Sequence, residues 1–517
     1  MDVAIRVDAS VAIGTGHVRR CLSLADTLSR MGCRPRFVMR RHDEAAVAVA
    51  AAIRHPVEWL PAPSTGRVWD EDVVPHAAWA GVSWAQDVAD TLAVLVAEPP
   101  EWVVVDHYAF DSRWHDAIRA ELGCRILAID DLGDRPLAAD VLLDGNVAAS
   151  HDKKFSGRLR DRTRLLVGPR FALLASAYRT AARARLSPTV NSIGVFMGGT
   201  DLGGASAGVL TALRTEAGFD GDVEIVSTTA NPEWRALEAR CAQDGRATLV
   251  LDLPDLSDFY ARHDLHIGAG GTSSYERCCV GAATIAVVLA ENQLAVIPDL
   301  SALGAIRPAR LPGMASSSLL PDLPSVGAVA RELIADSGQR HGLSRTARAL
   351  VDGRGAERAA LVVMADRLAV RAATPGDAAM LHAWRNDPVT REVSIDTRDI
   401  PYAAHVSWLE AVLAAADRRL FIAEVAGVPV GAIRFDRDDD GAWEISLYMD
   451  PALHGLGLGG RMLLAGERAI VRMAAAAVVF DAQVVEGNEV SARMFARAGY
   501  ARNGNRFRKV RDQEKTA

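Results

Sequence analysis

The chain has 517 residues, of which 50% are hydrophobic and 24% are charged, and its formal net charge at pH 7 is −7. This length is too great for one ordinary hydrophobic core and predicts about three domains. The composition is typical of a globular protein. Because an acidic chain lacks the basic footprint of a nucleic-acid-binding protein, we expect no nucleic-acid partner.

Targeting and redox signals are also informative. The N-terminus shows no basic region followed by an apolar stretch, and the alanine-rich segment 45–53 is far shorter than the roughly 20 residues that a membrane helix needs. The six cysteines show no CxxC spacing, which indicates neither a disulfide framework nor a zinc knuckle. We therefore expect a cytoplasmic protein with no membrane partner.

The first segment of the chain joins a strand, a glycine turn and a helix. Residues 3–7 form a β-branched run, and apolar side chains recur at helical spacing after the turn that contains Gly14 and Gly16. Such a turn lets the backbone approach a diphosphate, so both glycines are predicted to bind substrate. His17 opens the helix, where the helix dipole favours a neutral imidazole, and we predict that it is a general base. A plain tight turn with an ordinary histidine is the alternative.

Two apolar runs further along the chain end in polar clusters. Residues 102–105 are fit for a strand covered on both faces and end in Asp106, His107 and Tyr108, while a second run ends at Asp131. In open α/β sheets, ligands bind at the carboxyl edge of the strands, so all three residues, together with Asp130 and Asp131, are candidates to line the same cleft as His17. Of these, we predict that Asp106, His107 and Tyr108 bind substrate. Aspartates there also commonly cap the next helix, which is the alternative. No spacing among these residues defines a metal-ligand set, and we predict no metal.

A second α/β unit repeats the glycine turns. The turn residues that we expect to bind substrate are Gly199, Thr200, Gly270, Gly271 and Thr272. Three such turns at equivalent positions predict two Rossmann-like domains that hold a diphosphate between them. The strand at 284–289 leads into polar groups suited to a sugar's hydroxyls and amides, namely Glu291, Asn292 and Gln293.

The motifs of the first 365 residues resemble one family when they are taken together. They read DASxxIGTGHVRRCLxLA, DHY after a strand, IDDLGDRPLAADVLLDGN, FMGGTD, GAGGTSSYERC and AENQ. This set resembles the UDP-2,4-diacetamido-2,4,6-trideoxy-altropyranose hydrolases of pseudaminic acid biosynthesis. That family is similar to the two-domain GT-B glycosyltransferases but transfers the sugar to water. The resemblance implies a UDP-linked amino sugar as substrate.

The same resemblance gives roles to individual residues. It implies that His17 is the base, that Glu276 holds the ribose hydroxyls, and that Asn292 and Gln293 bind the sugar. Tyr275 stands where the family usually has tryptophan, and we expect this departure to leave the chemistry untouched. Because a sugar diphosphate carries a good leaving group, positioned water, a base and anion stabilisation suffice without a metal or a covalent nucleophile.

The pattern changes after residue 365 to an α+β order that is mostly antiparallel. A hairpin is predicted from 420–425 and 428–435, and the strand at 444–449 runs into a glycine-rich loop that can cradle a pyrophosphate. This loop and the later NEVSARMFARAGY segment resemble the acetyl-CoA loop and the following helix of the GNAT N-acetyltransferases. The resemblance implies acetyl-CoA as cosubstrate, bound by Tyr448, Met449, His454, Gly455, Gly457, Gly459, Gly460, Arg461, Asn488 and Ser491.

The resemblance extends to the groups that move protons in the transfer. Glu444 resembles the usual base for deprotonating an amine, directly or through water, although a solvated strand carboxylate is the simpler alternative. Phe495 occupies the place of the usual tyrosine acid, so the leaving thiolate must take its proton elsewhere. The WRND sequence at 384–387, with His405 and Trp408, resembles a subgroup that includes sugar acetyltransferases and ribosomal-protein acetyltransferases.

We therefore expect three domains, at 1–185, 186–365 and 366–517. The predicted fold is two Rossmann-like domains in a GT-B-like arrangement followed by an α+β GNAT domain. The predicted function is bifunctional, because the last domain would acetylate the 4-amino group of a UDP-linked sugar and the first two would then hydrolyse off UDP. One alternative is a UDP-sugar glycosyltransferase fused to an acetyltransferase of unrelated target. The other is that one half is a non-catalytic binding module.

Overall fold

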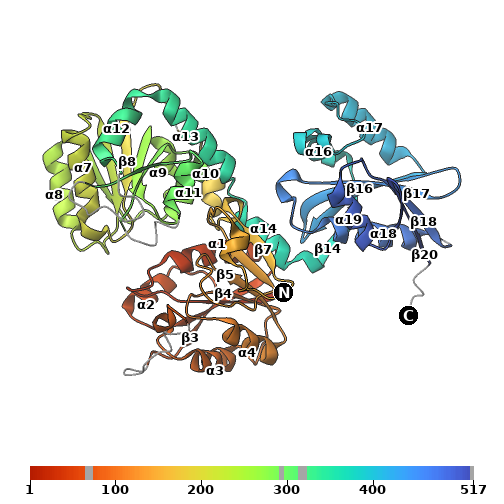
Figure 1. The fold of residues 1–517 in the computed structure, drawn as a ribbon, viewed down its shortest axis with the longest axis horizontal. Helices are drawn as coiled ribbons and strands as arrows, with labels where there is room; N and C mark the ends of the chain where they lie inside the picture. The colour runs from red at the N-terminus through yellow and green to blue at the C-terminus, as the bar shows by residue number, and fades with distance from the viewer. Residues whose placement is uncertain (64–73, 185, 290–295, 312–322, 475, 513–517) are drawn as a thin grey trace. The chain divides into compact units, whose positions relative to one another are not determined.

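The structure is a computed structural model that describes residues 1–63, 74–184, 186–289, 296–311, 323–474 and 476–512. Its contacts divide the chain into two compact units, Met1–Ala359 and Ala360–Ala517 (Figure 1). The first unit contains two lobes, each built on its own parallel sheet. The second unit thus begins at Ala360, and the domain boundary expected at residue 366 stays a prediction.

The first lobe is a seven-stranded parallel sheet in the order β3-β2-β1-β4-β5-β6-β7. Its strands are β1 (Asp2–Val7), β2 (Arg34–Arg40), β3 (Val57–Leu60), β4 (Trp102–Asp106), β5 (Arg125–Ile129), β6 (Val141–Asp144) and β7 (Arg164–Val167). Its helices are α1 (Gly16–Arg30), α2 (Glu44–Ala50), α3 (Trp84–Leu95), α4 (Ser112–Leu122) and α5 (His151–Lys154). The strand order reverses between β1 and β4, so the ends of these strands border the crevice where such sheets bind ligands.

Local sequence explains why the first β–α pair forms. Strand β4 is buried along its whole length, as expected for a strand with helices on both faces. Helix α1 has one apolar face because its buried side chains recur every three or four residues. They include Val18, Cys21, Leu24, Ala25 and Leu28.

The second lobe is a six-stranded parallel sheet in the order β10-β9-β8-β11-β12-β13. Its strands are β8 (Ser192–Phe196), β9 (Asp222–Ser227), β10 (Ala247–Leu251), β11 (Leu265–Ala269), β12 (Thr284–Val287) and β13 (Arg307–Ala309). Helices α7 (Ala205–Thr215), α8 (Trp234–Asp244) and α12 (Val326–Ala335) pack in one hydrophobic cluster. The other cluster contains α6 (Ser176–Thr180), α9 (Ser257–Arg262), α10 (Ser273–Val280), α11 (Ile297–Ala302) and α13 (Ser337–Leu350). Figure 1 shows α7 and α8 across β8 from α9 and α10.

The chain returns to the first lobe at the end of this unit. Helix α14 (Gly355–Val363) begins against residues 170–172, because Arg358 Nη1 donates to the Arg170 carbonyl at 2.6 Å. A Cβ on Gly355 would lie 2.1 Å from the Ala172 carbonyl oxygen, which shows how close the approach is. The sequence had assigned this segment to the second domain. Two Rossmann-like lobes in a GT-B-like arrangement are confirmed as the fold of this unit.

The C-terminal unit is a seven-stranded mixed sheet in the order β14-β15-β16-β17-β18-β20-β19. Its strands are β14 (Leu368–Ala372), β15 (Arg418–Val425), β16 (Val428–Arg437), β17 (Trp443–Met449), β18 (Val478–Gln483), β19 (Ala501–Asn503) and β20 (Arg506–Arg511). Its helices are α15 (Ala378–Asn386), α16 (Pro388–Glu392), α17 (Tyr402–Ala414), α18 (Gly459–Met473) and α19 (Glu489–Arg497). All strand pairs are antiparallel except β17 and β18, which confirms the predicted α+β, mostly antiparallel pattern.

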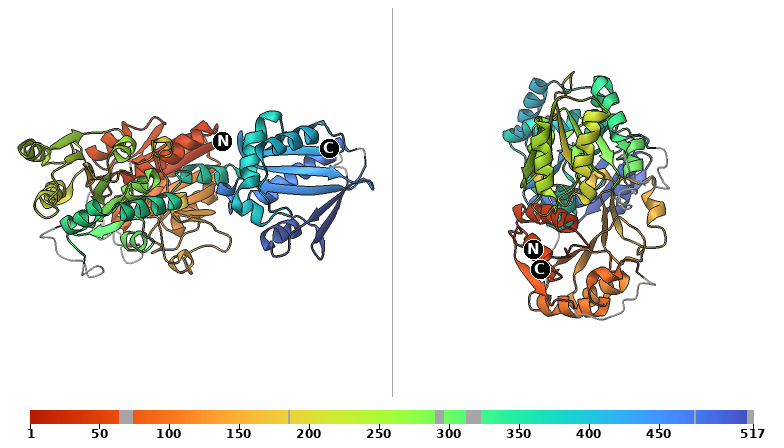
Figure 2. Two further views of the ribbon diagram at one scale, coloured as in Figure 1. Left: turned by 90° about the horizontal axis from the view of Figure 1, so that it is seen from above. Right: turned by 90° about the vertical axis from the view of Figure 1, so that its left-hand side faces the viewer.

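Helices cover both faces of this mixed sheet, as the left view of Figure 2 shows. Helices α15 and α17 share a core with β15 and β16. On the other face, Gly466 of α18 lies so close to β16 that a Cβ there would be 2.9 Å from Ile433. The parallel pair of β17 and β18 is short, since it spans only Trp443, Glu444 and Ile445 on β17. The rest of β17 therefore runs on beyond this pairing toward the glycine-rich loop.

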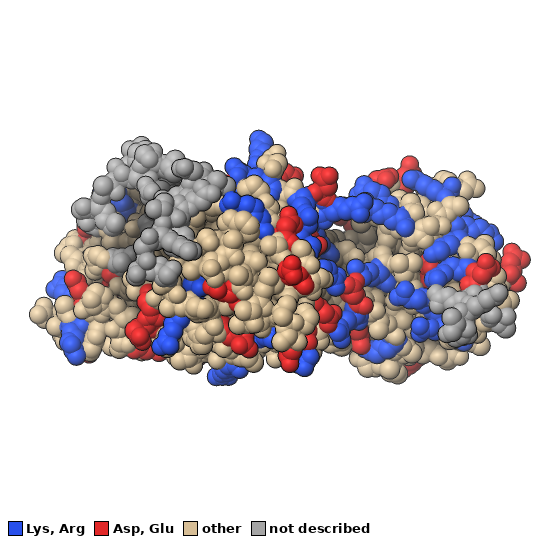
Figure 3. Space-filling model, turned by 90° about the horizontal axis from the view of Figure 1, so that it is seen from below, with Lys and Arg blue, Asp and Glu red and all other residues tan. Residues whose placement is uncertain are grey.

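The surface carries charges of both signs. On the face drawn in Figure 3, Lys and Arg side chains are interspersed with Asp and Glu side chains. Among the described helices, none combines the length and the apolar character needed to cross a membrane.

Candidate active sites

The first candidate site lies where the strand order of the first lobe reverses. His17 is the second residue of α1, and its Nδ1 lies 2.6 Å from Oδ1 of Asp106, the last residue of β4. Because a carboxylate only accepts, the proton of this contact belongs on Nδ1, which leaves Nε2 as the acceptor of the ring. The ring is 11% exposed and meets Tyr108 edge-on, with 4.7 Å between centroids. This geometry suits a general base held in one orientation.

Asp106 is buried, and its oxygens face protein groups. Arg20 donates from Nε and Nη2 to the two carboxylate oxygens at 2.6 Å each, and Cys21 Sγ lies 3.4 Å from Oδ2. Burial alone would raise the pKa of Asp106, but the charges of Arg20 and His17 more than offset this and hold the pKa well below its usual value. Substrate binding by Asp106 stays a prediction, and its burial and its partners favour a role in positioning His17.

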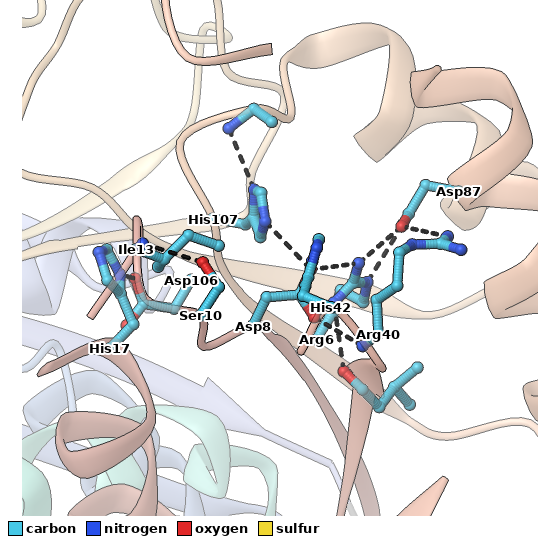
Figure 4. Close-up of polar contacts among 12 residues, drawn as sticks. Arg6, Asp8, Ser10, Ile13, His17, Arg40, His42, Asp87, Asp106 and His107 are labelled. Atoms are coloured by element: carbon cyan, nitrogen blue, oxygen red, sulfur yellow. Dashed lines mark hydrogen bonds and ion pairs between the residues drawn. The ribbon is translucent and has the colours of Figure 1, made fainter. Parts of the chain in front are cut away.

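His107 lies behind the candidate site. It is buried, and its Nε2 is 3.2 Å from Oδ2 of Asp8. Figure 4 shows Asp8 in a buried network in which Arg6 contacts both Asp8 and Asp87, at 2.6 Å each, and Arg40 contacts Asp87 at 2.8 Å. The His107 ring therefore faces Asp8 in the interior, and its contact with substrate stays a prediction. The network anchors the segment that joins β1 to the glycine turn.

A pocket lies beside the His17 pair, between the two lobes. Its lining includes Arg20, Asp131, Gly145, Asn146, Thr272 and Tyr275. Asp131 accepts hydrogen bonds from Tyr108 Oη and from Asn146 Nδ2, the latter at 3.0 Å, and contacts Arg20 at 3.3 Å. Burial would raise the pKa of Asp131, but Arg20 and the Tyr108 hydroxyl lower it below its usual value. The hydroxyl of Tyr108, predicted to bind substrate, is therefore engaged with an ionised carboxylate at the pocket.

Three residues that line this pocket, Arg20, Asp131 and Tyr275, were not among the residues predicted to bind substrate. Arg20 follows His17 by three residues on one helix, so helical spacing alone places the two side chains on one face. Asp131 was a candidate to line the cleft, and it lines the pocket. Tyr275 was expected to leave the chemistry untouched, but it lines the pocket, and its hydroxyl accepts from the Val147 N–H of the first lobe at 3.0 Å.

The glycine turns of the second lobe face the same region. Thr272 precedes α10, and a Cβ on Gly16 would lie 4.0 Å from Thr272 Oγ1, so the starts of α1 and α10 are neighbours. The Gly199 carbonyl accepts from Thr228 Oγ1 at 2.8 Å, which fixes the turn after β8, and Thr200 beside it is exposed. Gly270 donates its N–H to the Val287 carbonyl at 3.2 Å, and Gly271 lies between it and Thr272 at the start of α10, where helix N–H groups suit an anion.

Glu276 lies in the middle of α10, below this turn. Burial raises its pKa, and a hydrogen bond with Tyr178 and the charge of Arg19 on α1 offset part of the rise. Its role on the ribose stays a prediction. Glu291, Asn292 and Gln293 lie outside the described residues. Within the described ranges, no cluster of three His, Cys, Asp or Glu side chains could hold a metal ion.

The second candidate site is the loop between β17 and α18. Gly455 and Gly457 have φ values of +82° and +57°, and a Cβ at either would meet no atom within 4 Å. Leu456 and Leu458 between and after them are buried and anchor the loop. Because the first N–H groups of α18 have no partner inside the helix, the loop forms an open cradle for a pyrophosphate.

The other expected cofactor residues lie on β17, on the loop, on α18 and at the start of α19. Tyr448 and Met449 end β17, and Gly459 and Gly460 begin α18. His454 opens the loop. Asn488 Oδ1 accepts from the Ser491 N–H at 3.1 Å, so these two residues form the N-terminal cap of α19. Arg461 Nη1 forms an ion pair with Asp366 at 2.5 Å, so a phosphate that binds Arg461 would compete with this carboxylate.

Comparison with known families decides the nature of this unit. Residues 379–500 match the family described as "Acetyltransferase (GNAT) family". The C-terminal unit contains a GNAT domain.

In the GNAT domain, the candidate base and the missing acid have different surroundings. Glu444 is exposed on β17, directly opposite Asp436 on β16 and Asp481 on β18. Phe495 is only 4% exposed, against the Tyr500 ring, so it is a packing residue. The Tyr500 hydroxyl donates to the buried Glu467 at 2.8 Å. Of these groups, Glu444 is therefore the one that solvent and an amine can reach.

Relatives of the whole chain are distant. It is 23% identical over 253 residues to the UDP-2,4-diacetamido-2,4,6-trideoxy-beta-L-altropyranose hydrolase of Campylobacter jejuni. This match covers 49% of this chain and 78% of that protein. It is 23% identical over 241 residues to the spore coat polysaccharide biosynthesis protein SpsG of Bacillus subtilis, which covers 46% of this chain and 68% of that protein. A crystal structure of MurG from Acinetobacter baumannii covers 70% of this chain and 98% of that chain, at 13% identity and a TM-score of 0.48. The chain is therefore related to a family of sugar hydrolase and spore coat proteins and also carries the GNAT domain.

Proposed function

We propose that the protein is a bifunctional enzyme of pseudaminic acid biosynthesis. Its first unit hydrolyses UDP-2,4-diacetamido-2,4,6-trideoxy-β-L-altropyranose to the free sugar and UDP. Its GNAT domain uses acetyl-CoA to N-acetylate the 4-amino precursor. The observation that carries the hydrolase half is the 2.6 Å contact between His17 and Asp106 beside a pocket lined by both lobes. The similarity to the Campylobacter jejuni hydrolase supports the substrate class.

The hydrolysis needs one base and stabilisation of one leaving group. The Nε2 of His17 takes a proton from water while the water oxygen bonds to the anomeric carbon. The bond from that carbon to the diphosphate oxygen breaks, and UDP leaves with the electron pair. Asp106 stabilises the imidazolium that forms, as an orienting carboxylate does in other histidine-dependent hydrolases. Backbone N–H groups at the starts of α1 and α10 stabilise the charge of the diphosphate.

The acetyl transfer uses the loop before α18. The N–H groups of this loop would bind the pyrophosphate of acetyl-CoA, and Glu444 would take a proton from the 4-amino group, directly or through water. The nitrogen then bonds to the acetyl carbonyl carbon, and the carbon–sulfur bond breaks with its electron pair going to sulfur. Coenzyme A leaves as a thiolate that takes a proton from solvent, since Phe495 has none to give.

The decisive experiment for the hydrolase is UDP release without any acceptor other than water. His17→Asn should lose about 10²–10⁴-fold in kcat with a much smaller change in KM. His55→Asn is the matched control, because His55 pairs with Asp26 at the sheet edge, away from the pocket. UDP release that required a second sugar or lipid acceptor would identify a glycosyltransferase and contradict the proposal.

The order of the two reactions provides a test of the acetyltransferase half. A pocket that hydrogen-bonds an amide would meet a charged ammonium in the unacetylated sugar, and burying that unmatched charge costs several kcal/mol. UDP release from the 4-amino substrate should therefore be up to about 10⁴-fold slower until acetyl-CoA is added. Gly457→Trp, which fills the open cradle, should abolish the effect of acetyl-CoA and spare hydrolysis of the acetylated substrate. Equal release from amino and acetamido substrates by this variant would refute the order.

A further inference from the structure

A second cavity, of about 240 Å³, lies in the second lobe at the C-terminal end of α10. Its lining includes Tyr178, Arg179, Arg183, Cys279, Arg348 and Asp352. It shares no lining residue with the pocket beside His17. Neither the proposed hydrolysis nor the acetyl transfer uses it.

The charges of this cavity are unbalanced. Arg179 is paired with Glu357 at 2.6 Å, and Asp352 accepts from Arg358 at 2.7 Å. By contrast, Arg183 and Arg348 make no ion pair or hydrogen bond with any of the described residues. Burial and the charge of Arg183 both lower the pKa of Arg348, so the two guanidinium groups repel each other across the cavity.

The side chain of Arg348 packs against the end of α10 at the cavity. A Cβ on Gly281, which follows α10 with φ of +82°, would lie 2.3 Å from Cδ of Arg348. The stem of Arg348 therefore passes directly over the end of α10, where glycine provides the room. Gly353 similarly lies against Cys279, since a Cβ there would be 2.9 Å from Sγ. The stem of Arg348 is thus packed against the end of α10, and the residue as a whole is partly exposed.

We propose that this cavity is a binding site for a small phosphate-bearing metabolite. Guanidinium groups bind the oxygens of a phosphate through paired N–H donors. Two guanidinium groups without carboxylate partners carry two positive charges, which match the two negative charges of a phosphate dianion. The volume is below the roughly 300–1,000 Å³ typical of drug-sized ligands, which fits a phosphate with a small organic part. Tyr178 separates this site from Glu276, because it lines the cavity while its hydroxyl bonds to Glu276.

The test is calorimetric titration of the full-length protein with inorganic phosphate at constant ionic strength. Saturating UDP and coenzyme A are present, so that the nucleotide pocket and the GNAT cradle are filled. The wild-type protein should still bind one phosphate. The double variant Arg183→Gln with Arg348→Gln should bind it at least tenfold more weakly. The matched control is Arg240→Gln with Arg345→Gln, which removes the same charge from exposed side chains of α8 and α13 outside the cavity and should stay within twofold.

Two results would overturn the proposal. One is the absence of phosphate binding to the wild-type protein once UDP and coenzyme A are present. The other is an equal loss in the control variant, which would show a general effect of charge. The variant should melt no lower than the wild type in phosphate-free buffer, since it removes a repulsion. If the double variant does not fold, Arg183→Gln alone serves, because this side chain is exposed, and at least a threefold loss is expected.

Discussion

Replacing Asp106 with asparagine should disable the hydrolase through His17 while leaving the fold intact. The substitution keeps the size of a buried side chain but removes one of its two acceptors. Arg20 donates to both oxygens, and His17 Nδ1–H donates to Oδ1. An asparagine cannot satisfy all three donors, since it has one oxygen and one amide nitrogen. Arg20 retains its contact with Asp131 at 3.3 Å, which limits the cost to folding.

The magnitude follows from the two ways in which the asparagine can sit. With its nitrogen toward His17, it donates to Nδ1, which moves the ring proton to Nε2 and removes the base. With its oxygen toward His17, the ring keeps its proton on Nδ1, but a neutral amide replaces the carboxylate that pairs with the imidazolium in the transition state, and a charge-assisted bond worth about 1.5–3 kcal/mol is lost there. At 1.36 kcal/mol per tenfold change in rate, the second placement alone costs roughly 10- to 150-fold. Together the two placements give an expected loss of about 10²–10⁴-fold in kcat.

The assay is UDP release by Asp106→Asn, by His17→Asn and by the double variant. A residue that acts through His17 has nothing left to orient once the imidazole is gone. The double variant should therefore release UDP within about threefold of His17→Asn alone. Multiplication of the two single losses in the double variant would refute the positioning role, even if each single variant were slow.

Three further predictions concern other parts of the molecule. Glu444→Gln should lower acetyl transfer, measured as free thiol released from acetyl-CoA, by about 10²–10⁴-fold and leave UDP release from the acetylated substrate unchanged. UDP release should persist in EDTA, because the described residues bring no three metal-ligating side chains together; its loss in EDTA and return with Mg²⁺ or Mn²⁺ would contradict this. Asp87→Ala should lower the free energy of unfolding in urea by about 3–5 kcal/mol, because Arg6 and Arg40, both fully buried, lose their shared carboxylate. Burial would raise the pKa of Asp87, but the charge of Arg6 lowers it overall. The stabilisation by Asp87 is therefore complete above about pH 4, the pKa of the unfolded state, and is lost as pH falls further. Equal acid sensitivity of the wild type and the Asp87→Ala variant would argue against this prediction.

Local patterns predicted most of the fold. The strand expected at 3–7 is β1, the hairpin expected at 420–435 is β15 and β16, and each glycine turn joins a strand to a helix. These features depend on spacing within a few residues, which the sequence displays directly. The return of α14 to the first lobe depends on Arg358 meeting Arg170, and no local pattern carries that contact.

The residues of the candidate site also differ in whether local sequence or tertiary packing determines their place. The sequence singled out His17 as a candidate base because its place after a glycine turn is a local property. The direction in which Asp106 and His107 point was not predictable, since Arg20 and Asp8 reach them only through tertiary packing. Tyr275 carried a local signal, its departure from the family pattern, but its partner Val147 lies in the other lobe.

The neighbouring starts of α1 and α10 have a consequence for how specificity can change. Each helix start carries about half a positive charge that belongs to the backbone, and Gly16 and Thr272 bring the two charges together. No side-chain substitution can remove this attraction for a diphosphate. In the proposed hydrolase, the attraction for the diphosphate of the nucleotide would therefore come from the backbone, while the choice of sugar would rest on exchangeable side chains such as Asp131, Asn146 and Tyr275. A lineage with this architecture can therefore acquire new sugars by point mutation without first having to rebuild nucleotide affinity.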